Sequence, residues 1–105
     1  MLGLITLSLL VVSELSIQEG KEEEFLRLVT DGLEVSRNFQ GNQRFDIYAE
    51  SETPGKILFI EEWTSAEDFQ RYYRWRLGNG DFATLSTYFS APPRMRKYDT
   101  AAEEE

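Results

Sequence analysis

The sequence predicts an α+β domain in which two helices cover one face of a four-stranded antiparallel sheet. Two observations lead to this prediction. The hydrophobic patterns follow one another in the order strand, helix, strand, strand, helix, strand, and the first helix has one wide apolar face that suits a flat sheet. Right-handed crossover connections place both helices on the same side of such a sheet. The expected arrangement is therefore the ferredoxin-like β-α-β-β-α-β fold.

The chain has the size and composition of one folded domain. Its 105 residues are 41% hydrophobic and 13% aromatic, which supports a packed core and argues against disorder. We expect residues 1–99 to form a single domain and residues 100–105 to form a frayed acidic tail.

The charge and the missing residue types exclude several classes of function. The net charge is −8, so the surface repels phosphate backbones and anionic membranes. The sequence has no cysteine and no histidine, which excludes disulfides, thiolate chemistry, serine–histidine triads and histidine-ligated haem. The motifs RYYRWR and RMRK are of a kind that stacks on single-stranded nucleic acid, but the acidic surface argues against this. We therefore expect no cofactor, no metal, no nucleic-acid partner and no membrane partner.

The apolar N-terminal run LGLITLSLLVV has the composition of a secretion signal. No lysine or arginine precedes it, no small-residue cleavage site follows it, and Thr6 and Ser8 interrupt it. It is also shorter than the roughly 20 apolar residues of a membrane span. A strand over residues 4–17 is the better interpretation, and we expect a cytoplasmic location.

Residues 21–38 show the clearest helical pattern in the chain. At about 100° per residue, one half of this helix is apolar and the other half is charged. The apolar half consists of Phe25, Leu26, Leu28, Val29, Gly32, Leu33, Val35 and Ser36. Glutamates in the first turn suit the positive end of the helix dipole. We expect the helix to lie on the sheet, with Gly32 allowing a close approach.

Two further strands are expected at residues 41–50 and 56–63, joined as a hairpin by the loop SETPG. In the first of them, Asp46 alternates with apolar residues, and we interpret it as a member of an ordinary cross-strand ion pair. In the second, Glu61 shares a face with apolar residues and with Trp63. The sequence does not fix the strand register, so it leaves open which face of the sheet carries Glu61 and Asp46.

A second helix is expected to begin at Ser65, because Ser65 and Asp68 form a pattern typical of a capping box. Its inner face carries Phe69, Tyr72, Tyr73, Arg76 and Leu77. The run GNG at 78–80 ends this helix, and Asp81 is expected to cap a short third helix. The inner side of that third helix carries Phe82, Leu85, Ser86 and Phe89. Residues 94–99 are expected to form the last strand.

The predicted sheet has a second face that no segment of the chain is left to cover. An apolar sheet face that stays in contact with water is unfavourable. Two sheets from two copies of the chain, packed face to face, would remove both faces from water. We therefore predict a homodimer.

Four segments occur in a characteristic order and spacing, namely EGKEEEFLRLV, GNQRFDIY, ILFIEEWTSAEDFQRY and APPRMRKYD. The third is the most characteristic, because it combines an acidic residue, the strand-ending Trp63 and an aromatic residue on the following helix. Together, over about residues 8–99, they resemble the family of antibiotic-biosynthesis-monooxygenase-like (ABM) domains. The resemblance implies that ferredoxin-like domains pair as a dimeric α/β barrel.

The resemblance also implies an activity, the oxygenation of phenols, quinols or polyketide aromatics with O₂ and without a metal or a flavin. Some members of the family degrade haem instead. In that branch an asparagine falls near Ser13, a helix tryptophan falls on Tyr72, and the haem-ligating histidine falls near Ser86. All three residues are changed here, so the comparison argues against haem degradation.

Oxygenation without a cofactor requires a dry aromatic pocket, an acid–base group and a donor for the developing oxyanion. In a chain without histidine, the base must be a carboxylate with a raised pKa or a tyrosinate. Glu61 is the candidate carboxylate; the alternative is a strand-end glutamate that is hydrogen-bonded or paired with an arginine. Tyr72 is the candidate for contacting a ligand, with core packing as the alternative. Arg76 would hold an oxyanion or a carboxylate, or else extend to the rim or pair with Glu61.

Four more residues are expected to line a ligand pocket, namely Trp63, Ser13, Ser86 and Phe82. For Trp63 the alternative is packing between the third strand and the second helix. Trp75 lies about 120° around the helix from Phe69 and between two arginines, which indicates a subunit interface or the mouth of a pocket.

Two functions of different classes remain open from the sequence. The first is a cofactor-independent monooxygenase that acts on a small aromatic molecule. The second is a catalytically silent dimer that binds a small apolar ligand or serves as an accessory protein, and the changed positions near Ser13 and Ser86 favour it. A solvent-connected cavity lined by Tyr72 and Arg76 would favour the enzyme, whereas a filled core there would favour the silent form.

Overall fold

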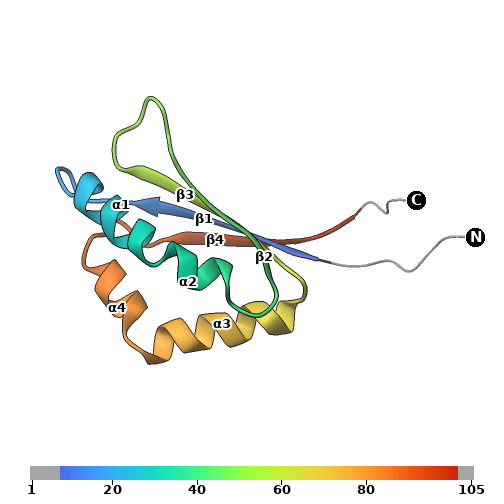
Figure 1. Ribbon diagram of the computed structural model, residues 1–105. Coiled ribbons are helices and arrows are strands. Elements are labelled where there is room, and N and C mark those ends of the chain that lie inside the picture. Colours follow the sequence, from blue (N-terminus) through green and yellow to red (C-terminus); the bar gives the residue numbers. More distant parts are fainter. Residues whose placement is uncertain (1–7, 102–105) are drawn as a thin grey trace, which may run out of the picture.

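The computed structural model describes residues 8–101, which contain four strands and four helices (Figure 1). In chain order these are β1 (Leu9–Ser16), α1 (Glu22–Asp31), α2 (Leu33–Arg37), β2 (Asn42–Ala49), β3 (Lys56–Trp63), α3 (Ala66–Gly78), α4 (Asp81–Ser86) and β4 (Arg94–Asp99). The predicted start of the first strand, residues 4–7, and the end of the acidic tail lie outside the described residues. None of the helices within residues 8–101 is long and apolar enough to cross a membrane.

All four strands belong to one antiparallel sheet with the order β2-β3-β1-β4. β2 and β3 form the predicted hairpin, and β1 lies between β3 and β4. Both connections that contain helices lie on the same face of the sheet (Figure 1). The predicted ferredoxin-like α+β fold is therefore confirmed.

The core lies between the helices and the two central strands, β1 and β3. Burial alternates along both strands, because every second residue points towards the helices. Phe25 of α1 stacks on Phe59 of β3 with 6.4 Å between the ring centroids. Trp63, at the end of β3, is fully buried and meets Phe69 of α3 edge-on at 5.9 Å. These aromatic contacts fix the helices over the sheet.

The helix predicted over residues 21–38 is divided into α1 and α2 at Gly32. Glycine has a low helix propensity, and Gly32 adopts φ −90° and ψ −3°, which departs from regular helix geometry. Its carbonyl oxygen accepts a hydrogen bond from the guanidinium of Arg76 in α3 at 3.2 Å. The break therefore gives a side chain of the opposite helix access to the backbone.

The N-termini of α3 and α4 are stabilised in different ways. As predicted, Ser65 caps α3, since its hydroxyl accepts a hydrogen bond from the backbone N–H of Asp68 at 3.1 Å. The prediction that Asp81 caps the next helix is wrong. Asp81 is the first residue of α4, and the side chain of Asn79 accepts a bond from its backbone N–H at 3.0 Å. The carboxylate of Asp81 instead binds Arg76.

Two side chains that were expected on inner helix faces point largely to solvent. Val35 of α2 is 48% exposed, and Leu77 of α3 is 59% exposed. The break at Gly32 changes the direction in which the residues of α2 point. Leu77 lies in the last turn of α3, where the helix borders a cavity rather than the sheet.

The face of the sheet opposite the helices is not covered by any element of residues 8–101 (Figure 1). At its centre lie four partly exposed apolar side chains, Leu10, Val12, Leu58 and Ile60. β4, at one edge, is exposed along its whole length. The pairing register also places Glu61 on the face covered by the helices and Asp46 on the uncovered face, which answers the question that the sequence left open.

Gly55 closes the loop between β2 and β3 against the end of β1. Its backbone has φ +83°, a conformation that residues with a side chain rarely adopt. Its carbonyl oxygen accepts a hydrogen bond from the N–H of Ile17 at 2.7 Å. A Cβ at this position would lie only 2.8 Å from the carbonyl oxygen of Ile17. Both the backbone conformation and the lack of space therefore favour glycine.

Gly55→Ala is expected to lower the free energy of unfolding by about 2–4 kcal/mol, because it combines a positive φ with a backbone clash. Gly20→Ala is the matched control, since Gly20 has φ +81° but no atom within 4 Å of its Cβ position. That control is expected to lose only about 1 kcal/mol. Urea denaturation measures the free energy of unfolding of both variants. Equal decreases would show that the close contact of the new Cβ with Ile17 does not destabilise the protein.

Candidate functional site

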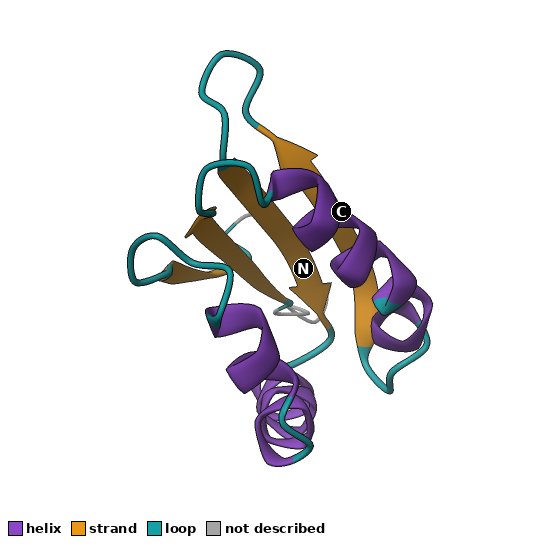
Figure 2. Ribbon diagram, turned by 90° about the vertical axis from the view of Figure 1, so that its left-hand side faces the viewer, coloured by secondary structure: helices purple, strands orange, loops and turns teal. Residues whose placement is uncertain are grey.

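A cavity of about 730 Å³ lies between the sheet and the helices. The helices form two separate groups, α1 with α2 and α3 with α4, with the sheet visible between them (Figure 2). The sheet provides the floor of the cavity, and both groups of helices provide its walls. Most of the lining is apolar, and its aromatic members are Phe45, Phe59, Phe69, Tyr72, Tyr73, Phe82 and Phe89. A volume of this size and character suits a small aromatic molecule.

Two polar side chains lie in the floor of the cavity, Ser13 of β1 and Glu61 of β3. β1 and β3 pair so that Ser13 lies opposite Phe59 and Val11 lies opposite Glu61. Ser13 and Glu61 are therefore diagonal neighbours on the same face of the sheet. Ser13 is 5% exposed and Glu61 is 4% exposed. Both residues were among those expected at the site, and they border the same cavity.

The carboxyl group of Glu61 is buried without an ion-pair partner among residues 8–101. The indole N–H of Trp63 donates a hydrogen bond to its Oε1 at 3.0 Å. Burial raises the pKa of Glu61 from 4.5 to about 7, although the bond from Trp63 opposes this shift. A carboxyl group with such a pKa both accepts and releases a proton near neutral pH. Glu61 is therefore hydrogen-bonded to Trp63 and forms no ion pair with an arginine within residues 8–101, and its role as a base stays a prediction.

The hydroxyl of Ser13 forms no side-chain hydrogen bond within residues 8–101, although the residue is buried. The second oxygen of Glu61, Oε2, likewise has no hydrogen-bond donor in the described part of the chain. Most buried polar groups in proteins have a hydrogen-bond partner. The floor of the cavity thus offers two polar atoms to a ligand.

A second set of polar groups joins the two groups of helices, and we call it the Arg76 cluster. It consists of Gly32, Ser36, Tyr72, Arg76 and Asp81. The hydroxyls of Ser36 and Tyr72 lie 2.7 Å apart, and Arg76 donates hydrogen bonds to them at 2.9 and 3.0 Å. Arg76 also donates to the carbonyl of Gly32 at 3.2 Å and forms an ion pair with Asp81 at 2.6 Å. The cluster connects α3 and α4 to the break between α1 and α2.

The Arg76 cluster contains a neutral phenol and a guanidinium cation. Burial raises the pKa of Tyr72, although the bonds with Ser36 and Arg76 lower it. Burial lowers the pKa of Arg76, but the bonds to Asp81 and Tyr72 outweigh this, and the net shift is upward. Tyr72 is therefore unsuited to act as a tyrosinate base near neutral pH. Of the two possible bases named above, only the carboxyl group of Glu61 has a suitable pKa.

Phe82 and Ser86, both expected in a ligand pocket, border the cavity from α4. Phe82 packs against Tyr73 of α3, with 4.7 Å between the ring centroids. Ser86 is exposed, and its hydroxyl donates a hydrogen bond to the carbonyl of Ala83 at 2.8 Å. Phe82 thus contributes an apolar wall, whereas the hydroxyl of Ser86 is engaged within its own helix.

Trp63 and Trp75 do not line the cavity. Trp63 is fully buried between β3 and α3, which is the packing alternative given above, and it acts on the cavity through its bond to Glu61. Trp75 is 42% exposed and packs against Phe39, with 5.5 Å between the ring centroids. Its assignment to a subunit interface stays a prediction.

Ser36 and Asp81 are members of this site that were not predicted from the sequence. Ser36 carried a signal, because it is a polar residue on the apolar face of the first predicted helix. Asp81 gave a misleading signal, since an acidic residue directly after a glycine-rich break is typical of a helix cap. The alternative pairing of Arg76 with Glu61 is also wrong, because Arg76 pairs with Asp81.

Residues 8–101 contain no group of three acidic side chains placed to hold a metal ion. The acidic side chains that border the cavity are Asp31, Glu61 and Asp81. Asp81 is bonded to Arg76, and the carboxyl group of Glu61 is bonded to the indole of Trp63. The mainly apolar lining therefore suits an organic ligand better than an ion.

The fold and the cavity define a class of protein, a two-layer α+β domain that encloses an aromatic pocket beneath its helices. Residues 8–74 match the model of the family described as antibiotic biosynthesis monooxygenase (ABM). This match spans more than half of the chain, and the chain belongs to the ABM family. A comparison with curated proteins found no match.

Solved structures share this fold at low sequence identity. A conserved protein from Methanosarcina mazei Go1 has a TM-score of 0.81 and 22% identity, with 89% of this chain and 92% of that chain covered. A "putative antibiotic biosynthesis monooxygenase" from Nitrosomonas europaea has a TM-score of 0.77 and 21% identity, with 94% and 95% covered. An antibiotic biosynthesis monooxygenase has a TM-score of 0.81 and 17% identity, with 90% and 99% covered. At such identities the similarity establishes the fold alone.

The raised pKa of Glu61 predicts how stability depends on pH. Between the ordinary pKa of 4.5 and the folded-state pKa of about 7, the folded protein holds a proton that the unfolded chain has released. The contribution of Glu61 to stability is therefore fully present below this window and is lost as the pH rises through it. The loss from this group amounts to about 3 kcal/mol.

Glu61→Gln removes the titrating proton and preserves the shape of the side chain. Urea denaturation from about pH 5 to pH 8 is expected to show a smaller loss of unfolding free energy for this variant than for wild type. Glu62→Gln is the matched control, because Glu62 lies on the uncovered face of the sheet, and it is expected to keep the wild-type slope. Parallel pH curves for wild type and Glu61→Gln would rule out a raised pKa at Glu61.

Proposed function

We propose that this ABM protein is a cofactor-independent monooxygenase that acts on a small aromatic molecule such as a phenol, a quinol or a polyketide ring. The observation that carries the proposal is the buried carboxyl group of Glu61 in the floor of an aromatic cavity. Membership of the ABM family supports a monooxygenase-like role in general terms. The aromatic substrate and the role of Glu61 are our proposals.

The presence of a cavity favours an enzyme over a catalytically silent dimer. A filled core beside Tyr72 and Arg76 would have favoured the silent form, whereas both residues border a cavity of about 730 Å³. Aromatic walls keep water from a reactive intermediate and accept a planar substrate. A proton acceptor in the floor then allows chemistry on the bound ring.

In the proposed reaction, the ionised form of Glu61 accepts a proton from the substrate, and Ser13 donates a hydrogen bond to the resulting oxyanion. The electron-rich ring carbon then reduces O₂ and forms a bond to one of its oxygen atoms. The O–O bond and the remaining C–H bond of that carbon then break, which forms the carbonyl and releases hydroxide that carries the C–H hydrogen. The hydroxide takes the proton that Glu61 held and leaves as water. One oxygen atom remains as a ring carbonyl, and the CH₂ carbon of an anthrone supplies all four electrons.

Tyr72 and Arg76 were predicted as catalytic residues, and we assign them a positioning role instead. The Tyr72 hydroxyl already bonds with Ser36 and Arg76. The guanidinium of Arg76 is bonded to the other members of the Arg76 cluster. These bonds hold the walls of the cavity at a fixed separation above Glu61.

Metal-free protein is expected to consume O₂ in the presence of an anthrone or a hydroquinone faster than buffer alone. Glu61→Gln is expected to reduce kcat by about 100-fold, because a general base typically contributes at least that factor. An oxygen electrode measures the rate, and absorbance identifies the anthraquinone that oxygenation of the anthrone forms. Glu62→Gln is the control with the same chemical change on the opposite face of the sheet. A wild-type rate equal to the buffer blank would refute the activity, and equal rates for wild type and Glu61→Gln would refute the role of Glu61.

We also propose that two copies of the chain pair through the uncovered faces of their sheets. The centre of this face is apolar and partly exposed, as described above for Leu10, Val12, Leu58 and Ile60. Packing two such faces together removes these side chains from water. A homodimer of this kind leaves the cavity on the outer, helix-covered side of each sheet.

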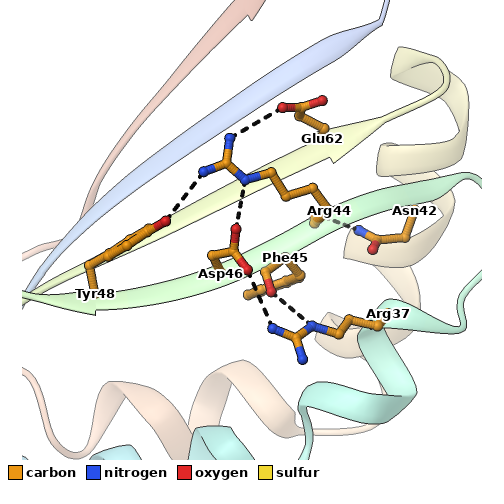
Figure 3. A network of polar contacts seen from close by, with 7 residues as sticks. All are labelled: Arg37, Asn42, Arg44, Phe45, Asp46, Tyr48 and Glu62. Atoms are coloured by element: carbon orange, nitrogen blue, oxygen red, sulfur yellow. Dashed lines mark hydrogen bonds and ion pairs between the residues drawn. The ribbon is translucent and has the colours of Figure 1, made fainter.

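Figure 3 shows a polar network at β2 and β3. The register pairs two of its members, Asp46 and Tyr48, with Ile60 and Leu58, so the network borders the apolar centre. The guanidinium of Arg44 binds Asp46 at 2.7 Å and Glu62 at 3.3 Å, and donates to the hydroxyl of Tyr48 at 3.3 Å. Arg37 reaches Asp46 from α2 at 3.4 Å. The bond to Asp46, followed by those to Tyr48 and Glu62, raises the pKa of Arg44. An apolar centre with a polar border is typical of protein interfaces.

Ile60→Arg is expected to convert the dimer to a monomer, because it places a charge at the centre of the proposed interface. Val35→Arg is the matched control, since Val35 is 48% exposed on α2, away from this face. Light scattering at micromolar concentration is expected to show a dimer for wild type and for the control. A monomeric wild-type protein would refute the proposed pairing.

A further inference from the structure

We infer that the cavity selects uncharged, hydroxyl-bearing aromatic molecules and rejects carboxylated ones, and that Asp81 is the residue that determines this choice. The inference rests on the proposed function only in taking the cavity as the ligand site. Arg76 is the only cationic side chain among the described residues that border the cavity. It is therefore the group that an anionic ligand would be expected to bind.

Arg76 is already occupied by the protein itself. A guanidinium has five N–H donors, and four hydrogen bonds from Arg76 go to Tyr72, Asp81, Gly32 and Ser36. The Asp81 carboxylate lies at 2.6 Å and cancels the positive charge. The Arg76 side chain is 15% exposed and that of Asp81 is 38% exposed, so the cation lies in the cavity wall while its partner is in contact with water. One N–H of Arg76 remains for an anionic ligand, and it lies on Nη1, the nitrogen that also donates to the Asp81 carboxylate. An anion there would meet the like charge of Asp81 or would have to displace it.

The remaining charged groups of the cavity also disfavour an anion. Asp31 and Glu61 border the same space, and neither has an ion-pair partner within residues 8–101. With Asp81 cancelling Arg76, the remaining charges of the lining are those of Asp31, which is exposed, and of Glu61 when it is ionised, and both are negative. A buried carboxylate ligand would add a further negative charge without a new partner.

The polar atoms in the floor indicate which neutral group is recognised. Ser13 offers a hydroxyl, and Glu61 offers an oxygen without a donor in the described part of the chain. A ligand hydroxyl can donate to ionised Glu61 and accept from Ser13; when Glu61 is protonated, the same hydroxyl can accept from the carboxyl O–H and donate to Ser13. The surrounding rings, including Phe45 and Phe59, then bury the apolar part of the ligand. A single ring hydroxyl directed towards the sheet can therefore form hydrogen bonds with both polar groups in the floor of the cavity.

The selection of neutral over anionic ligands thus depends on Asp81, a residue that has no role in the proposed reaction. Asp81 begins α4 and acts through Arg76. Replacing Asp81 by an uncharged residue would leave a cation in the wall of an apolar cavity. Such a cation would attract a carboxylate and would have little effect on a neutral hydroxyl compound.

The test compares 1-naphthol with 1-naphthoate, which share a ring system and differ in charge, by isothermal titration calorimetry at about pH 6. Glu61, with a pKa of about 7, is mostly protonated at this pH. Rejection of the carboxylate therefore cannot be attributed to a charge on Glu61. Wild-type protein is expected to bind 1-naphthol at least about tenfold more tightly than 1-naphthoate.

Asp81→Asn is expected to raise the affinity for 1-naphthoate relative to that for 1-naphthol by about tenfold, a ratio in which a general change of the cavity walls cancels because it affects both compounds. Asp31→Asn is the matched control, because it removes the same charge from the cavity wall and leaves the Arg76–Asp81 pair in place. It is expected to tighten 1-naphthoate binding by less than about threefold. Ser13→Ala is expected to weaken 1-naphthol binding by about fivefold.

Three results would overturn the inference. They are equal affinities of wild type for the two compounds, no binding of 1-naphthol, or an equal gain of 1-naphthoate binding in Asp81→Asn and Asp31→Asn. The wild-type comparison needs no variant, so it decides the selectivity even if a variant does not fold. Selective binding without O₂ consumption would refute the proposed monooxygenase and leave the ligand selectivity standing.

Discussion

The carboxyl group of Glu61 lies beneath the helices with the indole of Trp63 as its hydrogen-bond partner and, within residues 8–101, with no cation bonded to it. Burial of a carboxyl group without a cation costs free energy, which the group reduces by taking up a proton. Aromatic packing around Trp63 and Phe69 compensates this cost and fixes the indole that contacts the carboxyl group. The chemistry proposed for the cavity depends on this one buried group.

The Arg76 cluster keeps the cation of Arg76 bonded away from Glu61. Gly32 interrupts the first helix and offers a carbonyl oxygen to Arg76, while the start of α4 offers the carboxylate of Asp81. These bonds hold Arg76 in the wall of the cavity. A direct pair between Arg76 and Glu61 would lower the pKa of the carboxyl group and remove its value as a base. The Arg76 cluster therefore stabilises the shape of the cavity and also preserves the raised pKa of Glu61 in its floor.

The sequence predicts the fold more completely than the site. Alternating apolar residues in β1 and β3 and the capping pattern at Ser65 depend on local spacing, which the sequence displays directly. The partner of Arg76 depends on where α4 begins, and that start differs by one residue from the expected cap at Asp81. That Glu61 has no ion-pair partner within residues 8–101 likewise depends on packing between segments that are distant in the chain. The residue types alone identified Glu61 and Tyr72 as candidates. Only the three-dimensional contacts show that Glu61 is the proposed base and that Tyr72 helps to position the cavity walls.

The most direct test is a measurement of the Glu61 carboxyl group itself. Carbon-13 NMR of protein labelled at glutamate carboxyl carbons can follow each group as the pH changes, and the Glu61→Gln variant identifies the Glu61 signal. A midpoint of about 7 is the result expected from a carboxyl group buried without a cation. A midpoint close to the ordinary value of 4.5 would show that Glu61 is solvated or paired with a cation. That result would contradict both its burial and its proposed role as a base.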